Sequence, residues 1–227
     1  MIDRRDVIVD GVRIACHVRG APTAPPMVLL HALGEDAHSW DVVVDEFARA
    51  FRVFAIDLRG HGESDRPGVY SFELMRDDVL AVLDRLGLNR VTMVGHSMGG
   101  IVAYLIAERE PHRIDRLILE DTPPPFPRSR AVPERPDGPL PFDWAVVPAM
   151  VGQLNDPDPA WWDDLTAITA ATLLVAGGPE SHVPQDKLTE VAARLPRCTL
   201  LTIPVGHHVH EGRPTEFASV VTKFLDT

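Results

Sequence analysis

A single serine stands between glycines in the segment VTMVGHSMGG (91–100). The segment opens with an apolar, β-branched run typical of a buried strand, and IVAYLIAERE (101–110) then continues with helical spacing. The chain therefore passes from strand to helix without a loop, through a turn centred on Ser97. A turn this sharp brings neighbouring backbone segments close together. Gly95 and Gly99 have no side chains that would clash there. This feature predicts a strand–turn–helix unit at the centre of the fold.

The rest of the sequence alternates strand-like and helix-like segments in the same way. Apolar runs predict eight strands, at 6–11, 12–20, 26–32, 51–60, 91–96, 115–121, 172–178 and 199–204. Helical spacing predicts helices at 39–50 (with Ser39 as N-cap), 72–86, 98–110, 185–195 and 214–225. The Asp10-Gly11 pair predicts an N-terminal β-hairpin. Together they predict an α/β fold whose mostly parallel eight-stranded sheet carries helices on both faces.

One segment interrupts this alternation. Residues 122–165 hold 11 of the 21 prolines and three of the four tryptophans. The stretch 122–142 has too many prolines to be helical, and WAVVPAMVGQL (144–154) predicts a short helix broken at Pro148. We expect an α/β core at 1–121 and 166–227, with a short Pro/Trp-rich cap inserted at 122–165.

Charge and composition restrict the partners. A net charge of −11 argues against nucleic acid and against an anionic membrane surface. The N-terminal segment lacks the apolar stretch of a signal peptide, and the apolar runs are too short to span a bilayer. We therefore expect a cytoplasmic protein whose partner is a small-molecule substrate. Cys16 and Cys198 lie in strand-like runs and are interpreted as small core residues.

The position of Ser97 suggests a nucleophile. Sites in parallel sheets form beyond the carboxyl ends of the strands, which is where Ser97 lies. A strained turn exposes the hydroxyl, and the N-terminus of the next helix can stabilise a developing oxyanion. The alternative is a serine that only caps the helix. We prefer the nucleophile because the G-x-S-x-G pattern stands between a predicted strand and a predicted helix.

Four motifs in this order resemble those of the α/β-hydrolase fold superfamily, in its serine-nucleophile branch. They are LLHALGEDAHSW (29–40), DLRGHGESD (57–65), VGHSMGG (94–100) and VGHHVHEGRPTEF (205–217). The resemblance covers nearly the whole chain and implies a hydrolase that needs no metal and no other cofactor. A serine at position 97 disfavours the aspartate-nucleophile branches, which are the haloalkane dehalogenases and epoxide hydrolases.

The resemblance also implies an oxyanion hole. Its donors would be the backbone N–H groups of Leu33 and Met98. Ala32 follows His31 where the family usually has glycine, so this loop departs from the pattern. We expect His31 to organise the loop beside the substrate rather than to act as a base.

A histidine must activate the serine hydroxyl. The family pattern places the base directly after a glycine, which is His207 here, with His208 and His210 as close competitors. The H-H-x-H arrangement is also a possible metal motif. We disfavour a metal because no carboxylate or cysteine cluster stands nearby in the sequence.

The third member of the triad stays open. A carboxylate must orient the histidine, and the family places it between the nucleophile and the histidine in the chain. Glu180 occupies the loop where the family commonly has aspartate, and Glu120 ends the preceding strand, where some relatives carry the acid. Asp121 is the third candidate. His182, close to Glu180 in the same loop, is interpreted as a surface loop histidine.

The cap supplies the candidate substrate wall. Phe126, Phe142, Trp144 and Met150 are its apolar residues expected to face Ser97, although such residues also form cap cores. The predicted function is a serine hydrolase that cleaves a small to medium apolar carboxylic ester, thioester or lactone through an acyl-enzyme. C–C hydrolysis, perhydrolysis and lyase chemistry use the same residues and stay open. A ligand-binding or signalling protein with slow hydrolysis is the alternative of a different class.

Overall fold

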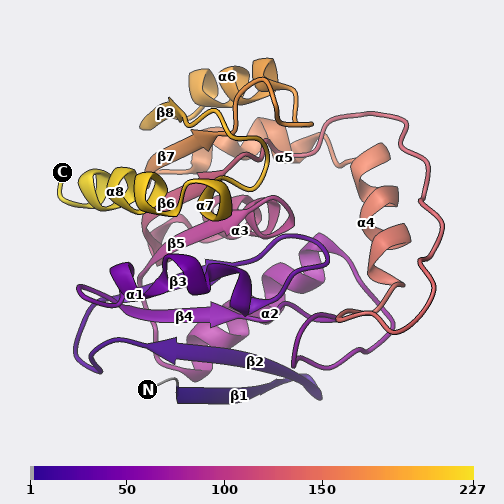
Figure 1. Ribbon diagram of the computed structural model, residues 1–227, viewed down its shortest axis with the longest axis horizontal. Helices are drawn as coiled ribbons and strands as arrows, with labels where there is room; N and C mark the ends of the chain where they lie inside the picture. The colour runs from indigo at the N-terminus through magenta and orange to yellow at the C-terminus, as the bar shows by residue number, and fades with distance from the viewer. Residues whose placement is uncertain (1–2) are drawn as a thin grey trace.

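Eight β-strands form one sheet in residues 3–227, the part of the chain that the computed structural model describes (Figure 1). They are β1 (Asp3–Val9), β2 (Val12–Arg19), β3 (Pro26–Leu30), β4 (Arg52–Ile56), β5 (Val91–His96), β6 (Ile114–Glu120), β7 (Ala171–Ala176) and β8 (Cys198–Thr202). Their order across the sheet is β1-β2-β4-β3-β5-β6-β7-β8. β2 runs antiparallel to β1 and β4, and every other neighbouring pair is parallel. The predicted α/β fold, with its mostly parallel sheet and N-terminal hairpin, is confirmed.

Strand β3 shows why these apolar runs become strands. It pairs with β4 on one side and with β5 on the other. Val28 and Leu30 pack into the apolar cluster on one face of the sheet, while Met27 and Leu29 pack into the cluster on the opposite face. Successive side chains of a strand point to opposite faces, so a strand covered on both sides must be apolar at every position.

Helices cover both faces of the sheet. Figure 1 shows α1 and α8 on the near side and α2 and α3 behind. The near face carries the 3₁₀ helix η1 (Ala37–Val42), α1 (Val44–Phe47), α7 (Val209–Gly212) and α8 (Pro214–Leu225). The other carries α2 (Phe72–Arg85), α3 (Met98–Arg109) and α6 (Gln185–Arg194), and the 3₁₀ helix η2 (Pro111–Arg113) leads into β6. No helix within residues 3–227 is both long and apolar enough to cross a membrane.

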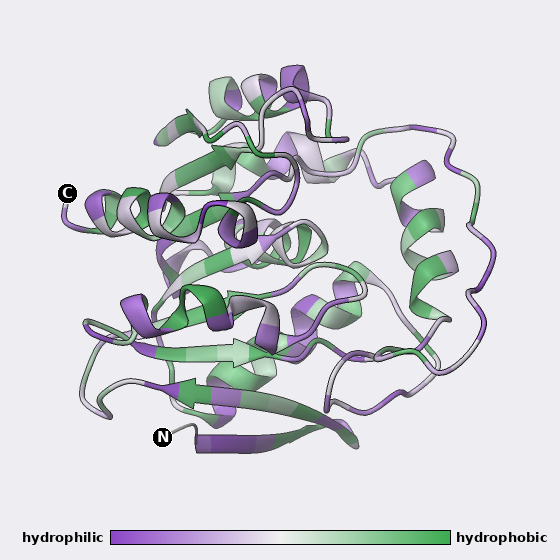
Figure 2. Cartoon of the chain, in the orientation of Figure 1, coloured by the Kyte–Doolittle hydropathy of each residue, from purple (hydrophilic) through white to green (hydrophobic). Residues whose placement is uncertain are grey.

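The hairpin gives the sheet a charged edge. Asp10 and Gly11 have φ values of 47° and 84°, and a type I′ turn requires positive φ at both of its central positions. β1 begins Asp-Arg-Arg-Asp, and Figure 2 shows this end in purple beside the green central strands. Charges on an edge strand discourage pairing with the sheet of another molecule.

Two local predictions need correction. In place of one helix over 39–50, η1 and α1 follow each other, and the cap is Asp36 rather than Ser39. The Asp36 carboxylate accepts a hydrogen bond from the His38 N–H, and aspartate caps helices as well as serine does. Cys16 is buried as predicted, whereas Cys198, on the edge strand β8, is only half-buried.

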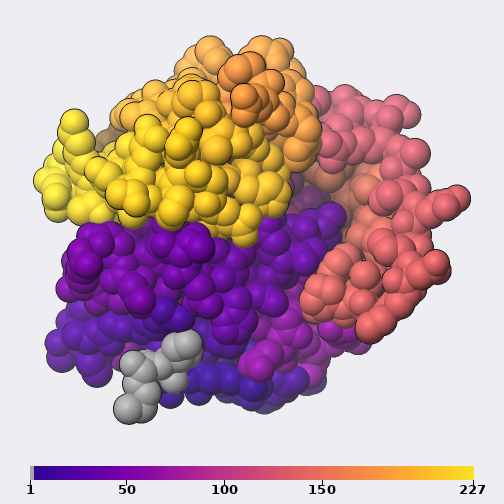
Figure 3. Space-filling model, in the orientation of Figure 1, coloured from indigo at the N-terminus to yellow at the C-terminus, as the bar shows by residue number. Residues whose placement is uncertain are grey.

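Residues 122–165 leave the sheet after β6 and return to it at β7. The backbone from 123 to 141 is free of regular helix and strand, as its prolines predicted. It is followed by α4 (Val146–Asn155), α5 (Ala160–Asp163) and the 3₁₀ helix η3 (Asp164–Ala167). Pro148 does not break α4, because it lies in the first turn, where a missing N–H leaves no helical bond unmade. Figure 3 shows the segment along one side of the molecule.

A buried ion pair ties the loop after β4 to α2. The Arg59 guanidinium donates two hydrogen bonds to the Asp78 carboxylate, and the two residues are 8% and 2% exposed. Burial raises the pKa of Asp78 above its ordinary value although Arg59 opposes that shift. The pair therefore forms at a desolvation cost, and losing one partner would leave the other charge buried and unpaired.

We predict that Asp78→Ala lowers the free energy of unfolding by about 3–5 kcal/mol, because Arg59 would stay buried without its carboxylate. Asp77→Ala on the same helix is the matched control, since Asp77 is exposed and pairs only at the surface. It should cost less than about 1 kcal/mol. Urea unfolding of the three proteins measures both effects, and equal losses would refute the role given to the buried pair.

Candidate active site

Ser97 occupies a strained turn between β5 and α3. Its backbone has φ 49° and ψ −113°. Within residues 3–227 only Asp10, Ser97 and Asp121 are non-glycine residues with positive φ, and the last two lie at the same sheet edge. Such a conformation costs roughly 1–3 kcal/mol and persists only where the surrounding structure imposes it.

The glycines around Ser97 permit two close backbone approaches. A Cβ on Gly99 would lie 2.3 Å from the carbonyl oxygen of Leu30, and one on Gly95 would lie 2.6 Å from that of Gly99. The Gly99 N–H donates to the His31 carbonyl at 3.1 Å, which joins the start of α3 to the end of β3. The structure confirms that these glycines are needed to form the turn.

Leu33 and Met98 border the same cavity as Ser97. Met98 is the first residue of α3, so its N–H belongs to the unpaired first turn of the helix. Leu33 follows β3 in the loop that the Gly99–His31 bond holds. Within the described chain no protein group accepts a hydrogen bond from either N–H, which leaves both available to an oxyanion.

His207 is hydrogen-bonded to Asp121. Its Nδ1 lies 2.8 Å from Oδ2 of Asp121, and the carboxylate is fully buried. The Asp121 carboxylate also accepts hydrogen bonds from the Gly177 N–H at 2.8 Å, the Ser181 hydroxyl and the Gln185 side-chain amide. Burial would raise the pKa of Asp121, but His207 and these donors hold it below its ordinary value. An ionised Asp121 keeps the proton on Nδ1 and leaves Nε2 of His207 free to accept one.

The expectation that Glu120 or Glu180 orients His207 is wrong in this structure. Glu120 accepts hydrogen bonds from the His210 backbone and from its Nδ1, at 2.8–2.9 Å, and both side chains are fully buried. Glu180 is exposed in a loop turn. Asp121 follows the last residue of β6 and has φ 45°, so it turns to the opposite side from Glu120. The two neighbouring acids therefore bind different histidines.

A second set of charges lies beneath the His207 loop. His96 is buried, and its Nε2 lies 3.0 Å from the His207 carbonyl oxygen. Although burial opposes the charge, Glu120 and Glu35 raise the pKa of His96 to about 9. His96 therefore carries a proton and donates to the His207 backbone, so it positions the loop that presents His207.

Two groups of side chains here have the composition of a metal site. They are Glu35, His96 and His208, and His96, Glu120 and His210. Both contain His96, and a histidine must be neutral to ligate a metal. Glu35 and Glu120 raise the pKa of His96 to about 9, so these groups form an ion-pair network, and a metal at either group would have to displace the His96 proton.

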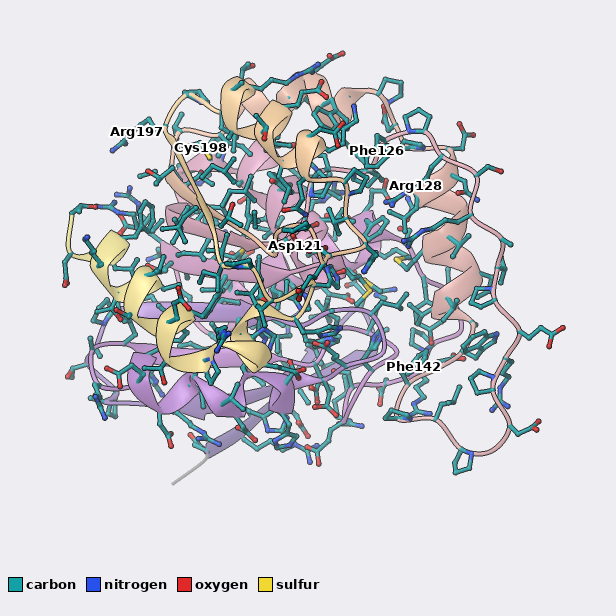
Figure 4. The ribbon with its side chains drawn as sticks, turned by 45° about the horizontal axis from the view of Figure 1, so that its top comes forward. Asp121, Phe126, Arg128, Phe142, Arg197 and Cys198 are labelled. Atoms are coloured by element: carbon teal, nitrogen blue, oxygen red, sulfur yellow. The ribbon has the colours of Figure 1, made fainter. Side chains whose placement is uncertain are left out.

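The cavity beside Ser97 has a volume of about 90 Å³. Phe126 and Met150 line it as predicted, but His31, Phe142 and Trp144 do not. The His31 Nε2 accepts from the Leu58 N–H, so this side chain is committed to the loops. Phe142 stacks on His61 and lies next to Trp144. Figure 4 shows Phe142 well apart from Phe126 and Arg128.

Three polar residues of the cavity were missed or misread in the sequence. Arg128 and Arg130 come from the proline-rich stretch, where no periodicity indicates which way a side chain points. His182, interpreted as a surface histidine, lines the cavity and lies 4.3 Å from His207 between ring centroids. Burial, His207 and Arg130 lower the pKa of His182 to about 4, which keeps it neutral.

Burial also lowers the pKa of His207 below its ordinary value. The hydrogen bond to Asp121 raises this pKa again, but only in part. The imidazole is therefore neutral at neutral pH, the state in which it can accept a proton from a hydroxyl.

Known proteins resemble this chain in sequence and in fold. A family model for the alpha/beta hydrolase fold matches residues 25–145. Epoxide hydrolase 4 of Mus musculus is 38% identical over 118 residues, which are 51% of this chain and 33% of that protein. The chain thus spans about a third of the length of that relative.

Two solved structures match over nearly the full chain. A hydrolase from Pseudomonas aeruginosa PA01 superposes with a TM-score of 0.87 at 26% identity, covering 99% of both chains. A thermophilic esterase from Thermogutta terrifontis superposes with a TM-score of 0.82 at 25% identity, covering 99% of this chain and 98% of that one.

We predict that Gly99→Ala destabilises the protein by roughly 2–3 kcal/mol, because its methyl group would overlap the Leu30 carbonyl. Gly152→Ala is the matched control, since its Cβ would meet open space in α4, and it should be neutral or slightly stabilising. Thermal unfolding of both variants provides the measurement. A Gly99→Ala protein as stable as the control would contradict the close approach described for this turn.

Proposed function

This chain belongs to the α/β-hydrolase fold family, and from that premise we propose that it is a serine hydrolase. Its substrate would be a carboxylic ester, thioester or lactone with small to medium apolar groups around the scissile bond. The observation that carries the proposal is the hydrogen bond between His207 and the buried Asp121, at the cavity that Ser97 borders. That bond supplies an oriented base at the cavity that the partly buried Ser97 also borders.

Acylation begins when Ser97 Oγ attacks the carbonyl carbon. His207 Nε2 takes the hydroxyl proton, and Asp121 stabilises the resulting imidazolium. The carbonyl oxygen becomes an oxyanion, which accepts hydrogen bonds from the N–H groups of Leu33 and Met98. When the intermediate collapses, the bond to the leaving group breaks and His207 returns its proton to the departing alcohol.

Deacylation repeats these steps with water. His207 removes a proton from the water as it attacks the acyl-serine, and the same two amides accept the second oxyanion. Collapse of this intermediate releases the carboxylic acid, and His207 returns the proton to Ser97 Oγ. No step requires a metal or another cofactor.

The identity of the nucleophile favours an ester over an epoxide. Attack of a serine on an epoxide would leave an ether, which this site has no means to hydrolyse. Attack on an ester leaves an acyl-serine that water can cleave. The similarity to a solved esterase over nearly the whole chain supports the same choice.

We predict that Ser97→Ala and His207→Ala each lower kcat/KM for 4-nitrophenyl butyrate by at least roughly 10³-fold. Asp121→Asn should lower it by roughly 10³–10⁴-fold, because an amide no longer holds the proton on Nδ1 of His207. Glu180→Gln, an exposed change on a nearby loop, is the control and should stay within about twofold of the wild type.

Glu120→Gln distinguishes the two neighbouring acids. It should reduce stability more than activity, since Glu120 contacts His210 and not His207. A Glu120→Gln enzyme that loses as much activity as Asp121→Asn while remaining folded would overturn the assignment. So would a fully active Asp121→Asn enzyme.

The pH dependence follows from the pKa of His207, which burial lowers. Only neutral imidazole can accept the serine proton, so kcat/KM should rise with pH through this pKa and then level off. We expect the midpoint below pH 6.5, the ordinary value for histidine. Initial rates from pH 4.5 to 8.5 test this, with circular dichroism at each pH to exclude unfolding. A midpoint above pH 7 would contradict the buried, neutral His207.

A further inference from the structure

Two arginines line a cavity in a strongly acidic protein. The chain carries 33 acidic residues against 22 lysines and arginines, yet Arg128 and Arg130 border the space next to Ser97. Figure 4 shows Arg128 close to Phe126, on the side of the molecule that the 122–165 segment occupies. Asp121, the acid of this cavity, is committed to His207 and to its other donors.

Arg128 is half-buried without a carboxylate. Arg59, Arg113 and Arg19 each form an ion pair with an aspartate, and Arg52 donates to a backbone carbonyl. Within residues 3–227, neither Arg128 nor Arg130 has an acidic partner. The buried Nε of Arg128 has no acceptor, a feature that it shares with the Nε of Arg52. Of the Arg128 guanidinium, Nε is the buried atom without a partner. A buried donor without an acceptor is costly unless a ligand supplies one.

The structure holds these arginines in place. The Arg128 guanidinium lies 4.8 Å from the centre of the Phe126 ring, a cation–π distance. The backbone N–H and carbonyl of Arg130 both bond to the Asn155 side chain of α4, at 2.8 Å. The Phe126 ring thus supports the Arg128 guanidinium, and Asn155 holds the backbone of the same stretch, while Arg130 itself is exposed. Contacts made before a ligand binds lower the entropic cost of binding.

We propose that this cavity recognises a carboxylate on the substrate, with Arg128 as its hydrogen-bonding partner and Arg130 adding positive charge. A guanidinium fork matches the two oxygens of a carboxylate, and its charge-assisted hydrogen bonds are stronger than those between neutral groups. Because His182 is neutral, it does not compete with Arg128 for the carboxylate. The inference rests on the proposed function and narrows its substrate to an ester, thioester or lactone that carries a remote carboxylate.

The test compares two esters that differ at one group. Mono-4-nitrophenyl adipate ends in a carboxylate where 4-nitrophenyl hexanoate ends in a methyl group. The wild type should prefer the adipate ester, and Arg128→Met should lower the ratio of the two kcat/KM values by roughly 10- to 100-fold. Arg135→Met is the matched control: it removes the same charge from the same stretch, but Arg135 lies outside the cavity and should leave the ratio unchanged.

A second pair places the charge on the leaving group, as 4-carboxyphenyl acetate against 4-methylphenyl acetate. A drop of the ratio in either pair on Arg128→Met supports the proposal and says which side of the scissile bond carries the anion. Unchanged ratios in both pairs overturn it, while Ser97-dependent hydrolysis of hexanoate would leave the proposed function standing.

Binding provides a readout that needs no turnover. Calorimetry of mono-4-nitrophenyl adipate with Ser97→Ala should give a roughly 10- to 100-fold tighter Kd than with Ser97→Ala/Arg128→Met. Equal affinities would refute the carboxylate site. Unequal affinities, in a protein that hydrolyses neither ester, would keep the anion site and refute the serine hydrolase.

Discussion

The direct contact between the backbone of α3 and the end of β3 is the constraint on which the rest of the site depends. Gly99 lies so close to the Leu30 carbonyl that no side chain fits between them, and its N–H bonds to His31. The contact holds Ser97 in a conformation that is unfavourable for an isolated residue. It also brings the loop of Leu33 beside the first turn of α3. One backbone contact thus fixes Ser97, the proposed nucleophile, and both proposed oxyanion donors.

Glu120 and Asp121, at the end of β6, hold different parts of the loop that carries His207. Asp121 bonds to the His207 side chain, whereas Glu120 turns the other way and bonds to His210. His96 lies between, paired electrostatically with Glu120 and bonded to the His207 backbone. The neutral imidazole of His207 is therefore positioned by the charged imidazole of His96. Burial keeps His207 neutral, and two neighbouring carboxylates keep His96 protonated.

Sequence reasoning succeeded where a local rule decides the structure. The alternation of apolar runs predicted the sheet, and Gly95 and Gly99 predicted the turn. It failed to choose Asp121 over Glu120 because a shift of one residue reverses the direction of a side chain on a strand. The positive φ of Asp121 could not be predicted either, since no glycine stands at that position. It failed on Phe142 and Trp144, and missed Arg128, because irregular backbone in a proline-rich stretch has no period from which to infer direction.

The proposed carboxylate site would let a small cap recognise its substrate. Apart from its scissile group, a neutral substrate would depend mainly on apolar area, and a cavity of about 90 Å³ offers little of it. A carboxylate gives strong and directional contacts from few atoms. In the proposed site Arg128 would supply these contacts, since it lies against Phe126 without an acid of its own, and its buried Nε without an acceptor costs stability in the free protein. Substrate binding would offset that cost, so a feature unfavourable for folding becomes a source of specificity.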